Sequence, residues 1–433
     1  MSYLAYLLPA VVTLGWYLWR YAKFERLSQE TQTDSIAAGL TEPASLHPVI
    51  DDARCIGCAA CIMACPEAPA HTVLGLIDNK ARLVSPTSCI GHSACRAACP
   101  TDAIQLVFGT ATRGIDLPRV SPHFETNVDG VFIAGELGGM GLIRNAVEQG
   151  RQAVGEIAKR RPKGRAPLDL VIVGSGPAGF SASLCATEQK LRFETIEQDS
   201  LGGCVFQYPR GKIVMTQPAI LPIVGAMNMT LTSKEKLLEF WQGAERQAGL
   251  KIRYGERVEA VTREGELFVV RTSKGELRTT TVLLTVGRRG TPRKLGVPGE
   301  DLPKVVYRLI DAQQYVGQRV LVVGGGDSAL EAAASCAEAG ASSVALSYRG
   351  EAFQRAKPRN RDRIAAAEKA RLLEVMLGSK VTKIHTDHVM LDAAGGRKIK
   401  LPNDAVIVSA GGVLPNEFLK SIGIEVVTKW GEA

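Results

Sequence analysis

Seven of the ten cysteines lie between Cys55 and Cys99, and their spacing constrains the fold more than any other feature of the chain. The first run, from Cys55 to Cys65, reads C-x2-C-x2-C-x3-C and is followed by Pro66. Three thiolates at this spacing can wrap one [4Fe–4S] cube, while the fourth, held beyond a turn by the proline, points to a neighbouring cube. Cysteines at metal-ligand spacings, unlike a secreted disulfide framework, indicate a reducing compartment.

The second run repeats the first, with His92 standing where a cysteine belongs and Pro100 at its end. Together the two runs resemble the bacterial two-cluster ferredoxin. The resemblance implies an α+β ferredoxin domain over residues 51–110 that holds two [4Fe–4S] clusters. It assigns the first cluster to Cys55, Cys58, Cys61 and Cys99, and the second to Cys89, Cys95 and Cys65.

His92 leaves the second cluster open to two interpretations. An imidazole is a competent iron ligand, and as a ligand it would remove one negative charge and raise the potential of the cluster. Alternatively His92 ligates nothing, and the site holds a [3Fe–4S] cluster or a cube with a non-protein ligand. A zinc site is the alternative for the whole stretch, but the doubled four-ligand pattern with both prolines disfavours it.

A strand, a glycine turn and an alanine-rich helix follow one another from Leu168. The turn reads G-x-G-x-x-G, whose backbone N–H groups face a pyrophosphate. The next strand, 191–196, ends in Glu197, where a carboxylate can accept the ribose hydroxyls, and a glycine pair soon after lets the backbone approach a flavin. The candidate contacts are Gly174, Gly176, Pro177, Ala178, Gly179, Glu197, Gly202 and Gly203.

A second strand–turn–helix unit begins at Gln318, and its next strand ends in Arg349 rather than in a carboxylate. Arg349, with Arg355 or Lys357, could pair with a 2′-phosphate, which favours NADPH over NADH. In the alternative interpretation Arg349 lies on a solvated strand end and the site takes NADH. The candidate contacts are Gly324, Gly326, Asp327, Ser328, Ala329 and Arg349.

The order of these two units, with connectors near Gly287 and Gly411, resembles the thioredoxin-reductase-like flavoproteins over nearly everything after residue 111. The resemblance implies an FAD-binding domain over 168–300, an NAD(P)-binding domain over 301–400 and a return to the FAD domain over 401–433. The expected fold class is therefore α/β, with two Rossmann-like dinucleotide-binding domains preceded by the ferredoxin domain and an N-terminal transmembrane helix.

One family segment stands too early in this chain. In the family the last FAD-binding segment reads T-N-V-x-G-V-F-x-A-G-D before a helix that begins R-x-A, and here it precedes the first glycine turn. The simplest account is a circular permutation in which residues 111–160 complete the FAD fold, because domain termini often lie close together. In the alternative account they complete the FAD fold of a neighbouring chain in a homodimer. The contacts implied by the resemblance are Gly135, Glu136, Arg144, Asn145 and Ala146, with Glu136 where the family has an aspartate that bonds the ribityl chain.

Residues 3–19 carry no charge, and about 17–25 apolar residues are enough to span a bilayer. Arg20, Lys23 and Arg26 follow, so the positive-inside rule favours a cytoplasmic location for the remainder. The sequence thus predicts a transmembrane anchor over 1–26, single-pass in the inner (cytoplasmic) membrane with soluble domains facing the cytoplasm. A signal peptide is disfavoured because no basic residue precedes the run and no cleavage site follows it, and a buried core helix is the remaining alternative. Residues 27–50 are expected to form a linker, and 161–167 a second one.

The expected enzyme is an FAD-dependent NAD(P)H oxidoreductase similar to ferredoxin–NADP reductases, with FAD, NADP or NAD, and two iron–sulfur clusters as cofactors. Because the cofactors carry the redox chemistry, no catalytic side chain is predicted. The partner is an electron-carrier protein or a quinone, and the direction of flow stays open. The net charge of +8 is scattered, which indicates a solvated surface rather than a nucleic-acid interface.

Two other functions remain alternatives. The chain could be an electron-transfer or scaffold subunit of a larger respiratory complex. It could also be a disulfide reductase that uses Cys204, although it has no C-x-x-C outside the ferredoxin runs. Cys185 and Cys336 fall in alanine-rich helices and are expected to pack in the core.

Overall fold

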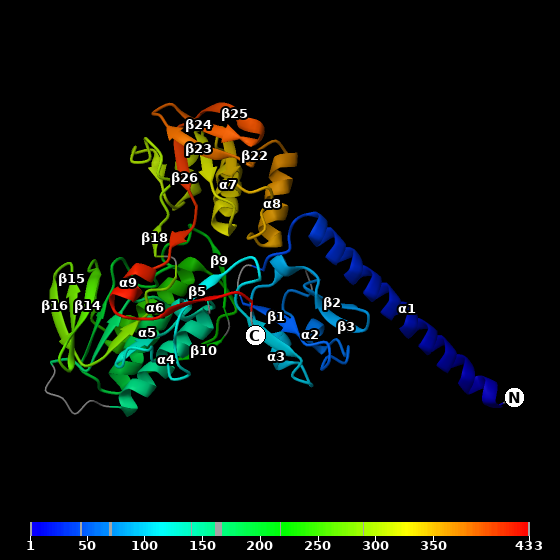
Figure 1. Cartoon of the computed structure of the whole chain (residues 1–433), viewed down its shortest axis with the longest axis horizontal. Coiled ribbons are helices and arrows are strands. Elements are labelled where there is room, and N and C mark those ends of the chain that lie inside the picture. The colour runs from blue at the N-terminus through cyan, green and yellow to red at the C-terminus, as the bar shows by residue number, and fades with distance from the viewer. Residues whose placement is uncertain are drawn as a thin grey trace.

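The computed structural model describes residues 2–43, 46–68, 72–139, 141–160, 167–216, 218–288 and 290–431, with side chains at all of these except 2–8, 10, 215, 291 and 394. Figure 1 shows a long N-terminal helix, a small module beside it, and two larger domains, one above the other. Most of the predicted linker at 161–167 lies outside the described residues, as do two residues of the linker predicted at 27–50.

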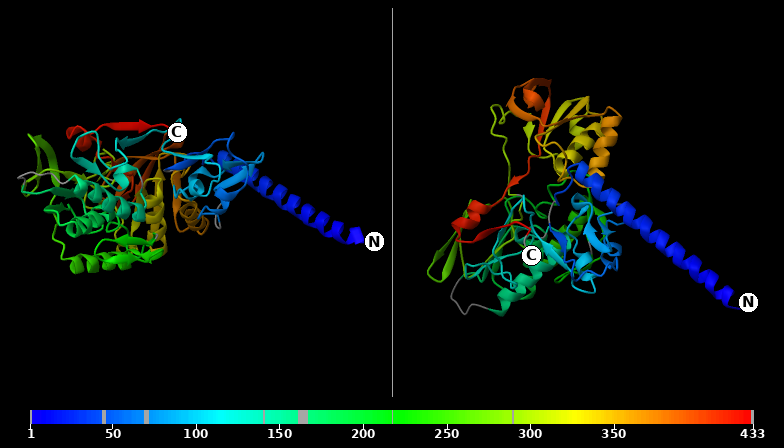
Figure 2. Two further views of the ribbon diagram at one scale, coloured as in Figure 1. Left: turned by 90° about the horizontal axis from the view of Figure 1, so that it is seen from below. Right: turned by 45° about the vertical axis from the view of Figure 1, so that its right-hand side comes forward.

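Helix α1 (Ser2–Ala37) is continuous and projects away from both nucleotide-binding domains (Figure 2). Among the described residues, no helix is long and apolar enough to cross a membrane. The predicted anchor at 1–26 and the single-pass localisation are therefore contradicted. The physical reason is the composition of the run, which is short, contains Thr13, Gly15 and several Tyr and Trp residues, and ends at Arg20.

The second half of α1 corrects the predicted linker at 27–50, because residues 27–37 are helical. The half-buried or buried positions Tyr21, Phe24, Ser28 and Ser35 recur at helical spacing on one face. Ser28 is fully buried, and its hydroxyl accepts a hydrogen bond from Leu76 N (3.2 Å). Within the predicted linker the buried positions are Ser28 and Ser35, two small polar residues, so hydrophobic periodicity did not reveal the helix there.

The ferredoxin module follows α1 and shows the internal duplication of the sequence. Strand β1 (His47–Ile50) pairs antiparallel with β4 (Ile104–Val107), and β2 (Leu74–Ile77) pairs with β3 (Lys80–Leu83). The short helices α2 (Ala60–Met63) and α3 (Ala94–Ala97) each follow a left-handed residue, Ala59 and Ser93. The 3-10 turn η1 (Pro86–Ser88) leads into the second cysteine run.

The FAD-type domain is built on a parallel five-stranded sheet in the order β13-β8-β7-β17-β6. Its strands are β6 (Val131–Ile133), β7 (Leu170–Val173), β8 (Phe193–Ile196), β13 (Ile252–Arg253) and β17 (Val282–Leu284). The inner strands β7 and β17 are apolar and buried along their whole length, as parallel strands covered on both faces must be. Helices α4 (Ile143–Lys159) and α5 (Pro177–Glu188) pack against each other in one hydrophobic cluster with this sheet.

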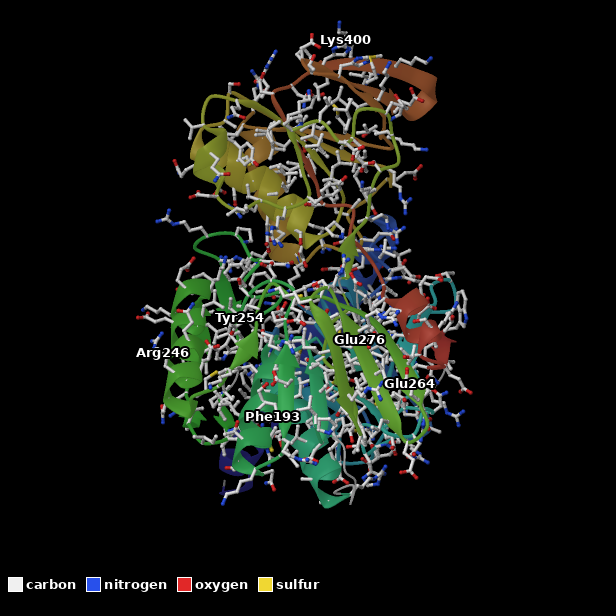
Figure 3. The ribbon with its side chains drawn as sticks, turned by 90° about the vertical axis from the view of Figure 1, so that its left-hand side faces the viewer. Phe193, Arg246, Tyr254, Glu264, Glu276 and Lys400 are labelled. Carbon is white, nitrogen blue, oxygen red and sulfur yellow. The ribbon has the colours of Figure 1, made fainter. Side chains whose placement is uncertain are left out.

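A three-stranded antiparallel sheet contributes to a second hydrophobic cluster of this domain and consists of β14 (Val258–Glu264), β15 (Leu267–Thr272) and β16 (Gly275–Thr279). Figure 3 shows this sheet with the exposed side chains of Glu264 and Glu276. The remaining elements of the domain are β9 (Ile213–Met215), β10 (Ala219–Leu221), β11 (Gly225–Met227), β12 (Leu231–Ser233), η2 (Glu136–Gly138), α6 (Lys234–Ala248) and α9 (Asn416–Ser421).

Strand β6 precedes the first glycine turn in sequence but lies at the edge of this sheet, parallel to β17 of the same chain. The end of the chain returns to the same region. Strand β28 (Val426–Lys429) pairs antiparallel with β5 (Ile115–Pro118), and Gly431 N donates to Phe108 O (2.9 Å). Strands β28 and β5 thus form a hairpin that lacks a covalent turn.

The nucleotide domain has a second parallel sheet, in the order β19-β26-β20-β21-β22. Its elements are β19 (Val305–Val306), η3 (Ala312–Tyr315), β20 (Arg319–Val323), α7 (Asp327–Ala339), β21 (Ser343–Tyr348), α8 (Pro358–Lys369), β22 (Glu374–Leu377), β23 (Lys380–Ile384), β24 (His388–Ala393), η4 (Ala394–Gly396), β25 (Arg397–Pro402) and β26 (Ala405–Val408). Because β26 belongs to this sheet, the predicted return to the FAD domain at 401 begins too early. The two connectors pair where β18 (Thr291–Pro292) meets β27 (Gly412–Val413).

Candidate functional site

A single cavity of about 2710 Å³, which we call the central cavity, extends between the two nucleotide-binding domains and the ferredoxin module. Among the predicted site residues, those that line it are Gly135, Glu136, Ala146, Gly174, Gly176, Pro177, Ala178, Glu197, Gly203, Gly324, Gly326, Asp327, Ser328, Arg349 and Cys89. Predicted contacts that are not part of its lining are Gly179, Gly202, Arg144, Asn145 and Ala329.

The first glycine turn has the shape of a dinucleotide cradle. Gly174 has φ +101°, and a β-carbon there would lie 2.9 Å from Thr285 O. A β-carbon at Gly179 would overlap the carbonyl oxygen of Gly174, so this position is needed for close helix packing. Helix α5 begins at Pro177 without a side-chain cap, which leaves its first N–H groups for an anionic ligand. The residues present therefore fit a bound pyrophosphate.

Glu197 lies at the end of β8, where the sequence predicted a ribose contact. It is only 6% exposed, and its carboxylate accepts hydrogen bonds from Ser175 N (2.7 Å) and Asp199 N (2.9 Å). These bonds fix its orientation at the cavity wall. Nearby Gly203 has φ +52°, and a β-carbon there would approach Gly176 within 3.1 Å.

The segment before the first glycine turn completes the same wall. Gly135 has φ +85°, and its N–H donates to Gln149 Oε1 (2.8 Å). Glu136 lines the cavity, and the half-buried guanidinium of Arg288 lies near it, donating to Asp116 O (3.0 Å). Burial lowers the pKa of Arg288, and the carboxylates of Glu136 and Asp116 oppose that effect.

The second glycine turn is closed by an aromatic ring. Gly324 has φ +147°, and a β-carbon at Gly325 would overlap the ring of Tyr348, which stacks on Phe353 at 5.7 Å. Asp327 at the start of α7 accepts from Lys357 N (2.8 Å) and Asn360 Nδ2 (2.7 Å), which ties α7 to α8.

Basic side chains gather at the nucleotide-domain side of the central cavity. Arg349, Arg355 and Lys357 were predicted from the sequence, and all three line it. Arg359 and Arg363 of α8 line it as well and were missed. The pattern that could have identified them is the basic stretch around Pro358. It was not used, because it does not follow the end of a predicted strand.

The first predicted cluster site is a small separate pocket lined by Cys55, Cys58, Cys61 and Cys99. Cys55 and Cys61 are buried, whereas Cys58 is exposed. Burial, reinforced by neighbouring cysteines, raises the pKa of Cys61 to about 11. Four thiols around one pocket are the donor set of an iron–sulfur cube, and the iron would have to displace their protons.

The second predicted site lies beside the first. Burial raises the pKa of Cys89 to about 11, and the neighbouring Cys95 and Cys65 add smaller contributions. His92 lies half-buried in the same loop. Among the described residues, no three His, Cys, Asp or Glu side chains converge in the way that ligands of one metal ion do.

Comparisons with known proteins agree with this geometry. The family described as pyridine nucleotide-disulphide oxidoreductase matches residues 171–432, and the family described as 4Fe–4S dicluster domain matches residues 47–100. The chain belongs to the pyridine nucleotide-disulphide oxidoreductase family. Its enzyme class, an FAD-dependent NAD(P)H oxidoreductase, is as predicted, and a ferredoxin-type domain precedes the reductase in the same chain.

Several similar proteins match about three-fifths of this chain. A ferredoxin–NADP reductase of Ignicoccus hospitalis is 29% identical over 262 residues, which is 60% of this chain and 82% of the relative. The bacilliredoxin reductase Bdr of Bacillus subtilis is 27% identical over 266 residues, with the same two shares. The solved bacillithiol disulfide reductase Bdr of Staphylococcus aureus is 26% identical with a TM-score of 0.54, covering 60% of this chain and 80% of that one.

Proposed function

We propose that this reductase moves electrons between NAD(P)H and two iron–sulfur clusters by way of bound FAD, and onward to or from a separate electron carrier. The observation that carries the proposal is the lining of the central cavity. Both glycine turns and Cys89 of the ferredoxin module line it, so the sites predicted for flavin, nicotinamide and the second cluster open into one space. The ferredoxin–NADP reductases among the relatives support this reading.

In this proposal FAD is held by the turn from Gly174 to Gly179, by Glu197 and by the segment around Glu136. When bound, it supplies hydride exchange with a nicotinamide and single-electron exchange with a cluster. The protein's residues bind the pyrophosphate at the start of α5, orient the ribose through Glu197, and shield the site from water with the buried strands behind it.

The nucleotide would lie with its pyrophosphate at the start of α7. Arg349, Arg355 and Lys357 would then be available to a 2′-phosphate, which favours NADPH. The four thiols of the small pocket would hold the first cluster. Cys65, Cys89 and Cys95 would hold the second, with His92 as its fourth ligand.

We also propose that residues 111–160 are a permuted last segment of the reductase. The position of β6 beside β17 supports this, since an intramolecular strand completes the sheet and no neighbouring chain is needed for it. The unclosed hairpin of β5 and β28 supports it further, because joining its two ends would restore an ordinary chain order. The relatives' unmatched fraction, about a fifth of their length, has the size of such a segment.

Disulfide reduction is the second candidate function. Cys204 lines the central cavity directly after Gly203, and two similar proteins are named as bacilliredoxin or bacillithiol disulfide reductases. If Cys204→Ser abolished reduction of disulfide substrates, this candidate would be favoured. Unchanged reduction of the clusters by NADPH in that variant would keep the first proposal.

The test is an anaerobic addition of NADPH or NADH to the reconstituted protein, followed by flavin absorbance and cluster EPR. We expect flavin bleaching followed by cluster signals, with NADPH the faster reductant, and a changed second-cluster signal in His92→Cys. Flavin that stays oxidised would contradict the proposal and favour a scaffold role. Identical cluster signals in wild type and His92→Cys would remove His92 from the ligand set.

A further inference from the structure

One hydrogen bond joins the nucleotide domain directly to the ferredoxin module. The Arg361 guanidinium, on α8, donates to Thr87 Oγ1 (3.0 Å) and to Ala356 O of its own domain (2.7 Å). Thr87 is only 4% exposed, so its hydroxyl is enclosed where the two parts meet. A second contact holds the nucleotide domain in place. Lys212 and Glu331 form an ion pair that links the FAD-type domain to the nucleotide domain.

The contact lies beside the second cysteine run. Thr87 is in η1, and the turn closes when Cys89 N donates to Pro86 O (3.1 Å). Successive α-carbons are about 3.8 Å apart, so those of Thr87 and Cys89 are separated by at most about 7 Å. Thr87, Ser88 and Cys89 all line the central cavity. The positively charged guanidinium of Arg361 therefore lies close to the predicted site of the second cluster.

That charge is not neutralised by a close ion pair, since none of the ion pairs among the described residues involves Arg361. Asp362 and Asp327 attract it from a greater distance, and the Asp327 carboxylate accepts bonds from Lys357 N and Asn360. The first cluster site has a cation of a different origin. Lys80 Nζ donates to Cys55 O (2.6 Å) entirely within the ferredoxin module.

We propose that Arg361 raises the reduction potential of the second cluster whenever the nucleotide domain is docked on the ferredoxin module. The inference rests on the cluster assignment in the proposed function. At about 10 Å and an effective dielectric constant of about 20, one unit of charge shifts a one-electron equilibrium roughly tenfold. By linkage, a reduced second cluster strengthens the docking by the same factor. The position of the nucleotide domain and the electron affinity of the second cluster are thus coupled, whereas Lys80 acts on the first cluster at all times.

The experiment is an EPR-monitored redox titration of the reconstituted full chain with a chemical reductant and mediators. For Arg361→Gln we expect the second-cluster potential to fall by about 59 mV, the one-electron equivalent of tenfold, with the first cluster unchanged. Lys369→Gln is the matched control, because it removes the same charge from an exposed position of the same helix and should shift neither cluster. Lys80→Gln should shift the first cluster alone.

Two further variants separate charge from damage to the fold. Thr87→Val keeps the shape and removes the acceptor, and it should lower the second-cluster potential in the same direction. Arg361→Lys keeps the charge and should restore most of the potential. Equal second-cluster potentials in wild type, Arg361→Gln and Thr87→Val would overturn the inference, as would an equal shift in Lys369→Gln.

The same wild-type sample distinguishes this inference from the proposed function. If NADPH fails to bleach the flavin while the chemical titration shows the Arg361 shift, the proposed function falls and the inference stands. If NADPH reduces flavin and clusters but Arg361→Gln leaves both potentials unchanged, only the inference falls. A wild type that assembles no second cluster would overturn both.

Discussion

At the scale of single residues, Gly150 determines how closely α4 can approach α5. A β-carbon at Gly150 would overlap the carbonyl oxygen of Ala178, the second residue of α5. The other glycine of this stretch, Gly155, has no atom within 4 Å of the position that a β-carbon would take. A side chain is therefore excluded at Gly150 and sterically allowed at Gly155 of the same helix.

We predict that Gly150→Ala lowers the free energy of unfolding by about 1–3 kcal/mol, because overpacking forces α4 away from α5. Gly155→Ala should raise it by up to about 1 kcal/mol, since alanine restricts the unfolded chain and favours the helix. Thermal unfolding together with the FAD content of the purified variants measures both effects. Equal stability of the two variants would show that the close approach of α4 and α5 is not what requires Gly150.

Residues that act through backbone geometry were the easiest to predict. The glycine turns and Glu197 follow a local pattern, and the structure has them at the wall of the central cavity. Arg361 could not be predicted, because its partner Thr87 lies 274 positions away in the sequence. Arg363 was missed as well, because its partners Glu338 and Ser335 lie on another helix, α7. Arg144 and Asn145, carried over from a family pattern, start the correct helix but do not line the cavity.

At the scale of elements, the second half of α1 belongs to the ferredoxin module. The Ser28 hydroxyl donates to Phe24 O (2.9 Å) and accepts from Leu76 N. Without this hydroxyl, the buried N–H of Leu76 would lose its acceptor on α1. We predict that Ser28→Ala destabilises the module by about 1–3 kcal/mol, the cost of an unsatisfied buried polar group. Thr33→Ala, at an exposed site of the same helix with the same type of bond to Gln29 O, should change stability by less than about 0.5 kcal/mol.

Chemical unfolding monitored by cluster absorbance measures this pair of variants. A similar loss in both would mean that the hydroxyl bond to the helix backbone matters and the contact with β2 does not. Unchanged stability in Ser28→Ala would contradict the view that α1 is part of this module.

The starts of β20 and β26 are joined by an ion pair that gives a defined pH dependence. Arg319 Nη2 donates to Asp404 Oδ1 (2.6 Å), and the side-chain bonds from Arg319 lower the pKa of Asp404 to about 2. A carboxylate with a depressed pKa contributes stability above its unfolded pKa of about 3.9, and loses that contribution as the pH falls through about 2. The pair is about two-fifths exposed, so its contribution is that of a surface pair.

We predict that Asp404→Asn is less stable than wild type by about 0.2–1 kcal/mol at pH 7. The difference should stay constant down to about pH 4 and shrink below it, because protonation removes the same interaction from wild type. Urea unfolding from pH 7 to pH 3 measures it, with Asp301→Asn, at an exposed and weakly paired position, as the control. If the stability difference between wild type and Asp404→Asn grew as the pH fell, the depressed pKa of Asp404 would be contradicted.

Most elements were predictable because parallel buried strands read as continuous apolar runs and glycine turns mark their ends. The linker prediction failed at residues 27–37, because the positions buried there are the small polar residues Ser28 and Ser35, and Ser28 bonds β2. The predicted end of the NAD(P)-binding domain at residue 400 was wrong. Strand β26 follows the antiparallel strands β23 to β25 and then pairs with β20, and no local sequence pattern predicts that pairing. The membrane anchor failed because absence of charge over a short run is a weaker criterion than hydropathy over a full span.

At the scale of the whole molecule, chain order and spatial order differ. Residues 111–160 precede the first glycine turn in sequence, yet their strand β6 lies at the edge of the sheet that carries this turn and their helix α4 packs on α5. The chain passes from the ferredoxin module into β5, and after β28 it returns to the end of the module, where Phe108 O accepts from Gly431 N (2.9 Å).

We predict that a rearranged chain, with residues 112–160 placed after Gly431 and the first 111 residues removed, folds, binds FAD and is reduced by NADPH. The control contains residues 167–431 alone, which lacks β6 and α4 and should not retain FAD, because its sheet loses an edge strand and α5 loses its packing partner. The FAD absorbance of both proteins after gel filtration measures how much FAD each one retains. A rearranged chain that holds no FAD would contradict the permutation.

The central claim is that flavin and two clusters form one electron-sharing unit within a single chain. It is tested most directly by counting NADPH consumed anaerobically per chain of fully reconstituted protein. The account predicts about two NADPH, since FAD takes two electrons and each cluster takes one. An end point at about one NADPH, with bleached flavin and no cluster EPR signal, would contradict it.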